Sequence, residues 1–407
     1  MGPLLFGSKC LRDEVWTSGF LLYDLQVICH QRKAIASGFG RRPMGMKRRV
    51  VVLAAGMFCG AVLPACSDTG GENVLLPARI YEVTKPFTDD DGGVAVNVSG
   101  LACMRTDAAQ STCLVIDDQG RFAQIARIGN GTVAAGARLA LIGRKPSKDT
   151  VGRPPVQPGC SGGNRKFKDL DGEAVAYTPP FFYVAGSHGC SRHGNKFHSS
   201  AFILARIPEG QIADASSDGT LSLDSSNVET TYRLSEALVA APQTRQYFTQ
   251  DLMSANGLNV EGLAVTGGKL FAGLRAPTRD GKAFIVAVDA GKLFDGSAVI
   301  NQGDVHTISV KLGFDRGIRD LARLNEEQLL ILSGPAQDAR VPFEIHVLDT
   351  MAETSTLLGT LGELPDAKGA KAEAISVLSQ HGNTIDVLVM FDGVKSGGPR
   401  EYSIILK

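Results

Sequence analysis

The chain has 407 residues, with 42 lysines plus arginines against 42 aspartates plus glutamates, so its formal net charge is zero. A balanced charge argues against nucleic acid or an acidic membrane surface as a partner, because neither would attract the chain over a distance. The 47 glycines recur between short runs of valine, isoleucine and leucine, which favours strands and tight turns over helices. We therefore predict an all-β protein, and we expect it to be a monomer.

The first part of the chain has the pattern of an export signal. Residues 46–66 begin with Met-Lys-Arg-Arg, continue through a short apolar run to Pro64 and end in small residues, which are the three parts of a secretory signal peptide. The apolar run is shorter than the roughly 20 residues that a membrane-spanning helix needs. Residues 1–45 precede this complete signal and are predicted to be a non-native extension, with Met44 or Met46 as the natural start.

The end of the signal resembles a bacterial lipobox. In Leu63-Pro64-Ala65-Cys66 the cysteine stands where lipidation would make it the first residue of the mature protein. The polar, Gly-rich stretch that follows opens a tether, which we place at residues 67–75. Ordinary cleavage with a soluble product is the alternative. We predict an exported protein, periplasmic or held at the cell envelope, which meets a membrane only through the lipid anchor on Cys66.

Four cysteines lie beyond the signal: Cys103, Cys113, Cys160 and Cys190. An even number in an exported chain favours disulfide bonds, and four cysteines allow three pairings. Cys103 and Cys113 flank a short polar loop between two apolar runs and would close a hairpin, which leaves Cys160 with Cys190. A metal site is the competing interpretation, although neither a Cys-x-x-Cys pair nor zinc-finger spacing supports it.

A short motif recurs along the mature chain. It begins with a turn-forming or acidic residue and enters an alternating apolar run, and further apolar runs follow. The copies start at Ser99, Asp171, Val260, Ile318 and Ala372. Repetition of motif, strand, turn and strand at intervals of roughly 50 to 90 residues is typical of propeller blades. We predict a single β-propeller domain of five or six blades over residues 76–407.

Two parts of the chain bear on closure and on the number of blades. The apolar tail Tyr402–Leu406 and the early run Val74–Val83 are predicted to complete one blade from both chain ends, which would remove exposed strand edges. A sixth, degenerate blade would have to lie within Pro208–Asn259. In that stretch the Ser/Asp-rich segment Ala213–Asn227 indicates an exposed insertion.

Four copies of the motif carry an acidic residue: Glu173, Glu261, Asp320 and Glu373. Equivalent positions of successive blades converge on the axis of a propeller, so these carboxylates would ring one mouth of the channel. Crowded carboxylates raise one another's pKa unless a cation joins them, and Ca²⁺ tolerates irregular oxygen coordination. The alternative is structural: the acids accept backbone N–H groups from the neighbouring blade, or pair with Arg275 and Arg319.

Two further sets of residues are candidates for binding or catalysis. Ser187 and His188 lie in Gly186–Cys190, just after a predicted strand. Adjacent strand residues point in opposite directions, so this pair is no Ser-His relay, and His188 is a candidate cation ligand or general base. Arg275 and Arg319, with Ser187, are candidates for holding a phosphate or carboxylate group. Burial as salt-bridge partners is the other interpretation of the arginines.

Several motifs in one order resemble an uncharacterised (domain-of-unknown-function) family of bacterial exported propellers. The matching segments are Asp171-Gly172-Glu173-Ala174, Gly186-Ser187-His188, Asn259-Val260-Glu261-Gly262-Leu263-Ala264, Gly273-Leu274-Arg275-Ala276-Pro277, Gly317-Ile318-Arg319-Asp320-Leu321-Ala322 and Glu373-Ala374-Ile375. They span most of residues 95–407. The first motif has its Gly and Glu in an unusual order, and Glu373 is followed by alanine rather than glycine. The family is more distantly similar to esterase-like phytase propellers and to calcium-binding six-bladed hydrolases, which implies a hydrolase as one function to test.

Two functions follow as expectations. The first is an exported propeller that binds a small molecule or an envelope partner without catalysis. The alternative is a Ca²⁺-dependent hydrolase of phosphoesters, esters or lactones at the channel mouth. In that case the four acids would hold the ion, the two arginines would hold the anion, and His188 would move a proton.

Overall fold

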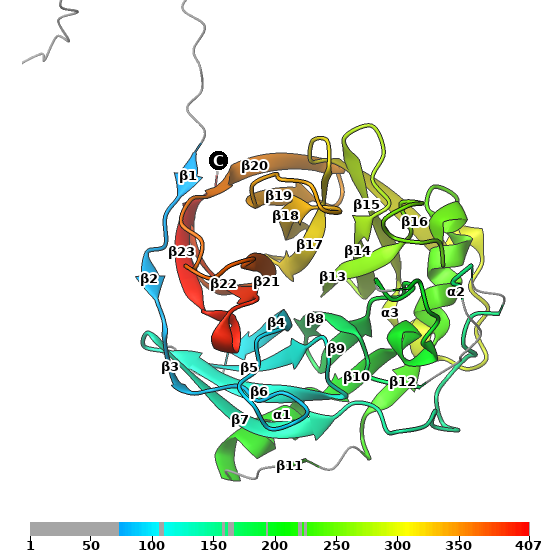
Figure 1. Cartoon of the computed structure of the whole chain (residues 1–407), viewed down its shortest axis with the longest axis horizontal. Coiled ribbons are helices and arrows are strands. Elements are labelled where there is room, and N and C mark those ends of the chain that lie inside the picture. Colours follow the sequence, from blue (N-terminus) through cyan, green and yellow to red (C-terminus); the bar gives the residue numbers. More distant parts are fainter. Residues whose placement is uncertain are drawn as a thin grey trace, which may run out of the picture. The chain divides into compact units, whose positions relative to one another are not determined.

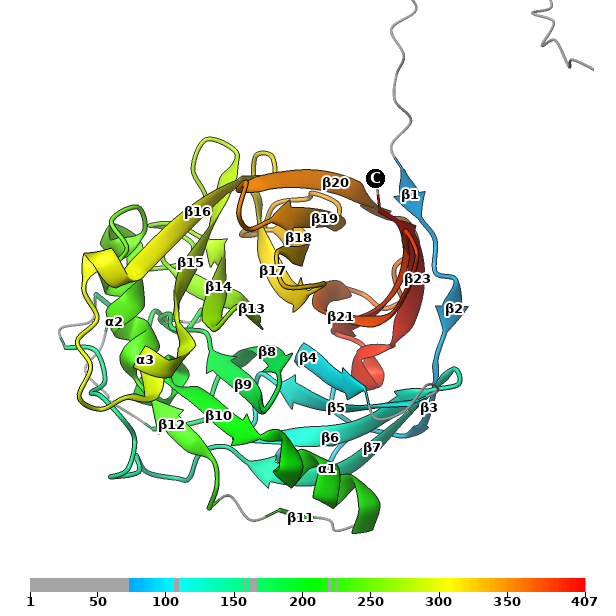
Figure 2. The same ribbon diagram turned by 180° about the vertical axis from the view of Figure 1, so that it is seen from behind.

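The computed structural model describes residues 73–105, 110–156, 159–161, 167–192, 194–218, 222–223 and 226–406. The predicted extension 1–45, the signal 46–66 with Cys66, and the tether up to residue 72 lie outside these residues. Within them, five β-sheets are arranged around a central axis (Figure 1 and Figure 2). The protein is therefore a five-bladed β-propeller, which confirms the all-β prediction and the lower of the two predicted blade numbers.

Each blade is an antiparallel sheet of four strands that runs from the axis outwards. Blade 1 consists of β4 (Val98–Arg105), β5 (Gln110–Asp117), β6 (Phe122–Gly129) and β7 (Thr132–Ala140). Blade 2 consists of β8 (Gly172–Thr178), β9 (Phe181–Gly186), β10 (Leu204–Pro208) and β12 (Glu229–Thr231). Blade 3 consists of β13 (Asn259–Thr266), β14 (Lys269–Ala276), β15 (Lys282–Asp289) and β16 (Val305–Lys311). Blade 4 consists of β17 (Arg316–Arg323), β18 (Gln328–Pro335), β19 (Glu344–Asp349) and β20 (Thr354–Leu361). Blade 5 consists of β21 (Lys371–His381), β22 (Thr384–Asp392), β23 (Arg400–Ile405) and β2 (Arg79–Ile80).

The core lies between the blades rather than within one of them. One apolar cluster joins blades 3 and 4, another joins blades 4 and 5, and a third joins blades 5 and 1. Inner strands are covered on both faces, so every residue of β13 is buried. The outer strand β16 instead alternates between buried and exposed residues towards its end, as expected of a strand with one solvated face. This gradient explains why the inner strands read as nearly continuous apolar runs.

The stretch Pro208–Asn259 holds no sixth blade among its described residues. Besides β12 it contains β11 (Ser222–Leu223), which pairs in parallel with β7, and the helices α1 (Glu209–Asp218) and α2 (Arg233–Ala240). The remaining helical segments are α3 (Ala290–Phe294), η1 (Ser199–Phe202), η2 (Arg245–Tyr247), η3 (Gln302–Asp304) and η4 (Lys395–Gly397). In the described part of the chain, none of the helices has the length and apolar character that spanning a membrane requires.

The N-terminal segment 73–85, which we call the strap, runs along the outer edges of three blades (Figure 1). Its strand β1 (Val74–Leu75) pairs in parallel with β20, β2 pairs antiparallel with β23, and β3 (Glu82–Lys85) pairs in parallel with β7. Closure of one blade from both chain ends is therefore confirmed. The predicted tether 67–75 extends too far, because Val74–Leu75 is already a strand and Leu75 is buried.

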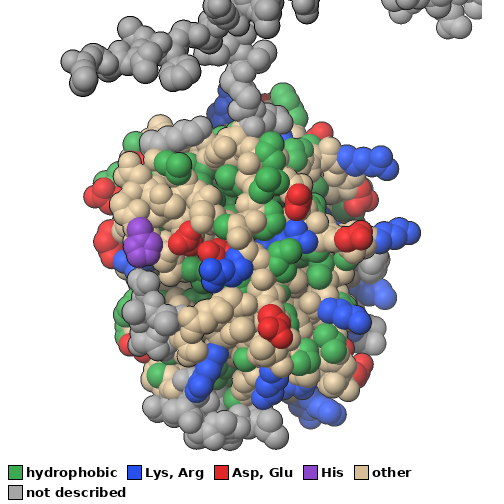
Figure 3. Space-filling view, turned by 90° about the vertical axis from the view of Figure 1, so that its left-hand side faces the viewer, with side chains coloured by type: hydrophobic (Ala, Val, Ile, Leu, Met, Phe, Trp, Pro, Cys, Tyr) green, Lys and Arg blue, Asp and Glu red, His purple; other side chains and the backbone are tan. Residues whose placement is uncertain are grey.

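On the side shown in Figure 3, lysines and arginines are interspersed with acidic side chains.

Candidate functional site

Each inner strand carries a β-bulge near its start. The pairing register with the second strand of the blade skips one residue there, so that residue is left out of the hydrogen-bond ladder. Bulges re-aim a side chain and are frequent beside functional sites. We call the five skipped residues the bulge ring; they are Ser99, Glu173, Glu261, Arg319 and Glu373.

Blade 4 departs from the predicted ring of acids. The motifs align Asp320 with the other three carboxylates, but the register places Arg319 in the bulge and Asp320 one residue later. Asp320 is fully buried, and its carboxylate accepts the N–H groups of Leu321 and of Ile375 in blade 5, both at 2.8 Å. Burial raises the pKa of Asp320 well above its ordinary value, and these amide hydrogen bonds act to lower it. Asp320 thus links blade 4 to blade 5 through a backbone amide.

The residue after the bulge lies against the next blade in other repeats too. A Cβ added to Gly262 would lie 3.0 Å from the backbone nitrogen of Leu321, and one added to Gly100 would lie 3.0 Å from that of Val175. At these positions only a residue without a side chain lets the two inner strands approach closely. The glycine of the repeated motif therefore serves the packing of blade against blade, and Asp320 meets the same need with an acceptor.

Arg319 joins the bulge ring across three blades. Its guanidinium lies 2.8 Å from a carboxylate oxygen of Glu261 in blade 3 and pairs with Glu373 in blade 5. Arg275, on β14, lies 2.7 Å from the other oxygen of Glu261 and donates from Nε to the carbonyl of Ala336. Burial acts to lower the pKa of Arg319, but the two carboxylates raise it above its ordinary value. Both arginines are thus engaged as ion-pair partners, the interpretation that the sequence left open beside anion binding.

Glu173 differs from the other two acids of the ring. No hydrogen bond or ion pair joins its carboxyl group to any of the described residues, and its side chain is only half-buried. It lies in the wall of a cavity at the channel mouth. Burial raises the pKa of Glu173 well above its usual range, and the neighbouring Glu261, Asp171 and Asp118 raise it further. Among the four acids predicted from the motifs, Glu173 is therefore the one that faces open space.

The cavity, which we call the mouth cavity, has a volume of about 520 Å³. Its wall includes polar residues at or near strand ends in four blades: Asn97, Asp118, Asp171, Glu173, Asn259 and Asp392. Burial raises the pKa of Asp118 to about 8, with further contributions from Asp171 and Asp117. Crowded, partly desolvated carboxyl groups in a concave site are a common feature of functional sites.

Five of these six cavity residues, all except Glu173, were not singled out as candidates from the sequence. Asp118 lies just after β5, Asp171 just before β8, and Asn259 and Asp392 at strand ends. Part of the signal was available, since Asp171 opens one copy of the repeated motif and Asn259 opens one of the segments that match the family. What the sequence lacked was the information that these strand ends meet at one mouth. Which strand ends lie at the same mouth of a propeller channel depends on the direction of each strand and on the turn that precedes it.

Ser187 and His188 both lie beneath the cavity wall. The Ser187 hydroxyl donates to the carboxylate of Asp171. His188 is fully buried in a left-handed backbone conformation, and its Nδ1 lies 2.8 Å from the carbonyl of Gly186. Its Nε2 has no hydrogen-bond partner within the described residues. Burial lowers the pKa of His188 to about 4, so the imidazole is neutral near pH 7. The cavity is lined by the next residue, Gly189, rather than by this ring.

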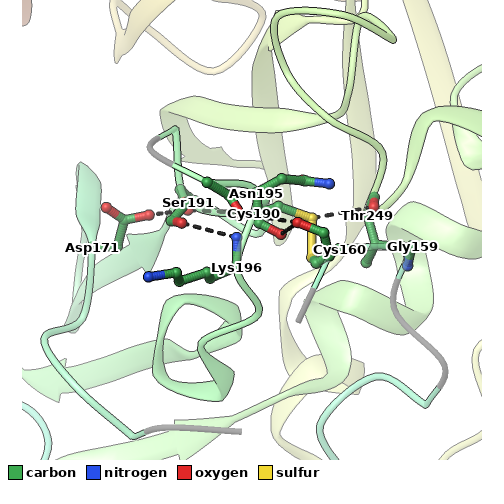
Figure 4. The surroundings of a disulfide bond; sticks show 12 residues. Gly159, Cys160, Asp171, Cys190, Ser191, Asn195, Lys196 and Thr249 are labelled. Atoms are coloured by element: carbon green, nitrogen blue, oxygen red, sulfur yellow. Dashed lines mark hydrogen bonds between the residues drawn. A yellow bond between two sulfur atoms is a disulfide. The ribbon is translucent and has the colours of Figure 1, made fainter. Parts of the chain in front are cut away.

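The described residues contain two disulfides, and both predicted pairings are confirmed. Cys103 and Cys113 are directly opposite each other on β4 and β5. The Cys160–Cys190 bond fixes the loop that forms one rim of the mouth cavity (Figure 4). The same loop is tied by the Ser161 hydroxyl, which donates to the carbonyl of Gly194 at 2.9 Å. This rim is therefore held in place covalently.

Below the bulge ring the channel becomes apolar. Two residues further along each inner strand, side chains return to the same face of the strand. There Leu101, Val175, Leu263, Leu321 and Ile375 line a space of about 60 Å³. The mouth cavity is thus polar at its floor and is backed by an apolar layer.

The described residues contain no group of three or more His, Cys, Asp or Glu side chains arranged to hold a metal ion. Glu261 and Glu373 are paired with arginines, and Asp320 is bonded to backbone amides. The calcium ring drawn from the sequence remains a prediction, and Glu173 is its one member with a carboxyl group open to a cavity.

Fold and site together define a five-bladed β-propeller with a polar cavity at one mouth of its channel. The family model described as "Protein of unknown function (DUF3616)" matches residues 162–403, more than half of the chain. The chain belongs to this family, which confirms the resemblance drawn from the motifs. No curated protein matches it in sequence.

Solved structures match this chain at low sequence identity and with low TM-scores. An exo-β-1,3-galactanase from Clostridium thermocellum is 10% identical, with a TM-score of 0.39, over 81% of this chain and 63% of that one. The hydrazine synthase of Kuenenia stuttgartiensis is 10% identical, with a TM-score of 0.33, over 76% and 58%. A protein from Lactobacillus plantarum is 15% identical, with a TM-score of 0.29, over 78% and 74%. The chain spans about three fifths of the first two proteins, and these likenesses leave its activity open.

Proposed function

We propose that this protein is an exported propeller that binds a small polar ligand in the mouth cavity. The observation that carries the proposal is the cavity itself: about 520 Å³, with carboxyl and amide groups converging from four blades. This volume lies in the range of about 300–1,000 Å³ that is usual for small-molecule sites. The rim is fixed by a disulfide and the floor by the paired ring, so the site is pre-organised for binding.

Export is supported by the two disulfides, because such bonds persist in oxidising compartments. The signal 46–66 and the lipid acceptor Cys66 supply the route, with the periplasmic side of the envelope as the destination. The test is fractionation of cells that express the full chain. Wild type should be recovered with membranes, and Cys66→Ala should be recovered in the soluble envelope fraction. Recovery of both forms in the cytosol would contradict the proposal.

Ligand binding is tested with a variant that fills the cavity. Asn97, half-buried in the cavity wall, is replaced by tryptophan, and thermal midpoints of the full chain are measured with a panel of amines, amino acids, sugars, carboxylates and phosphoesters. A ligand at one hundred times its Kd stabilises by about 2.7 kcal/mol. We expect at least one class to raise the midpoint of wild type and not that of Asn97→Trp. Equal shifts in both proteins, or none in either, would refute binding in this cavity.

A Ca²⁺-dependent hydrolase is the second candidate function. The observation in its favour is that Glu173, Asp171 and Asp118 share one half-buried wall, where hard oxygen ligands suit Ca²⁺. Against it stand the ion pairs of Glu261 and Glu373. The test is the thermal midpoint with Ca²⁺ and with chelator. A rise with Ca²⁺ that is lost in Glu173→Gln would support an ion in the cavity and justify assays of phosphoester, ester and lactone hydrolysis.

A further inference from the structure

The bulge ring has one carboxyl group more than it has guanidinium partners. Glu261, Glu373 and Glu173 supply three carboxyl groups, whereas Arg319 and Arg275 supply two guanidinium groups. Both arginines are directed to Glu261, and Arg319 also reaches Glu373. Glu173 is left over, and it is the one that lines the mouth cavity. One positive group placed in the cavity would therefore complete the ring.

The wall around Glu173 offers further acceptors without donors. Asn259 is 6% exposed, lies in the cavity wall, and its Oδ1 has no hydrogen-bond partner among the described residues. Oδ1 of Asp118, in the same wall, is also a buried atom without a hydrogen-bond partner among the described residues. A buried acceptor left unpaired costs about 1–3 kcal/mol, so these atoms favour a ligand that brings N–H donors. The Asn259 amide is independent of the acidic cluster and indicates the same kind of partner.

Basic side chains occupy the exposed part of the cavity wall. Lys168, Arg192 and Lys196 line it and are exposed, whereas Asp118, Asp171 and Glu173 are half-buried. Arg192 and Lys196 belong to the loop held by the Cys160–Cys190 bond, of which Lys196 is seen in Figure 4. Negative groups thus lie deep and positive groups lie at the rim. A ligand whose charges all have one sign would be repelled by the groups of that sign at one end of the cavity.

We infer that the ligand of the mouth cavity is a small zwitterion whose primary ammonium group contacts Glu173, Asp118 and Asn259 and whose anionic end lies at the basic rim. This inference rests on the proposed function and adds the ligand class. Three N–H donors of an ammonium group match the three acceptors, and a carboxylate or phosphate matches Arg192 and the two lysines. A free ω-amino acid has this arrangement of charge.

Four five-carbon compounds test the inference by titration calorimetry on the full chain: 5-aminopentanoate, 1,5-diaminopentane, glutarate and 1,5-pentanediol. We expect 5-aminopentanoate to bind tightest. Diaminopentane should bind more weakly because the rim repels its second ammonium group. Glu173→Gln should weaken 5-aminopentanoate by about 10- to 100-fold, the usual effect of losing a hydrogen bond to a charged group. Arg192→Met should narrow the difference between 5-aminopentanoate and diaminopentane.

Matched variants keep the test decisive. Glu327→Gln, an exposed glutamate in the turn between β17 and β18, should leave all affinities unchanged. Asp118→Asn provides a second deep variant should Glu173→Gln fold poorly, as judged by its thermal midpoint. Tightest binding of glutarate or pentanediol, or unchanged affinity in both deep variants, overturns the zwitterion while leaving the cavity as a binding site. Binding of none of the four compounds overturns the inference, and the Asn97→Trp panel then decides the proposed function separately.

Discussion

Replacing Arg319 with methionine should destabilise the propeller more than any surface change of the same type. Arg319 is 1% exposed, and it is the partner of Glu373, whose side chain is 8% exposed. Methionine keeps an unbranched side chain but removes the charge. Glu261 retains Arg275 as a partner, whereas Glu373 is left buried and uncompensated. Breaking a buried pair by removing one partner costs about 3–5 kcal/mol, and we expect a loss of that size.

The assay is urea unfolding of the full chain, followed by circular dichroism. Arg323→Met is the matched control: it lies on the same strand, but its partner Glu326 is exposed, so its loss should be below about 1 kcal/mol. The double variant Arg319→Met with Glu373→Gln removes the orphaned charge and should regain part of the stability. Equal losses in Arg319→Met and Arg323→Met would refute the reasoning, as would a double variant whose losses simply add.

Three further predictions concern other parts of the molecule. Replacing both Cys160 and Cys190 with serine opens a loop with a sequence separation of 30, which should cost about 4 kcal/mol by chain entropy; a urea midpoint close to wild type would contradict this. The pKa of Asp118 is raised to about 8, so its contribution to stability is complete below the ordinary pKa of aspartate and is lost as pH rises through 8, at up to about 1.4 kcal/mol per pH unit. Asp118→Asn should remove roughly that slope from the pH dependence of the unfolding free energy between pH 5 and 8. Parallel pH curves for wild type and variant would disprove the assignment. Asp320→Ala leaves two buried amide donors unpaired and should cost about 3 kcal/mol in urea, whereas Asp320→Asn, which keeps one acceptor oxygen, should cost less; equal losses would rule out the amide contacts as the cause.

Much of the architecture could be predicted because it is repeated locally. Each inner strand is covered on both faces, so its apolar run and its opening turn recur in the sequence five times. The pairing of chain ends followed from unpaired apolar runs at both ends. The helix α2 was not predicted, although Leu234, Ala237 and Leu238 are buried at helical spacing. Eight residues are too few for that period to stand out among strands.

The site was harder to predict because it depends on register. A shift of one residue moves a side chain to the other face of a strand, and only the pairing of β17 with β18 shows that Arg319 rather than Asp320 occupies the bulge. The alignment of motifs chose Asp320 because it carries the same charge as Glu261 and Glu373. Charge similarity and structural equivalence disagree at this position, since the ring needs a cation between its acids.

The strap covers strand edges that would otherwise be open to pairing with other molecules. A segment of about a dozen residues covers strand edges on blades 4, 5 and 1, and it is anchored by few buried side chains, among them Leu75 and Tyr81. Its release would uncover β20, β23 and β7 together, and exposed edges are where strands of different molecules join. Conditions that release only the strap would therefore expose unpaired strand edges on three blades of one molecule at the same time.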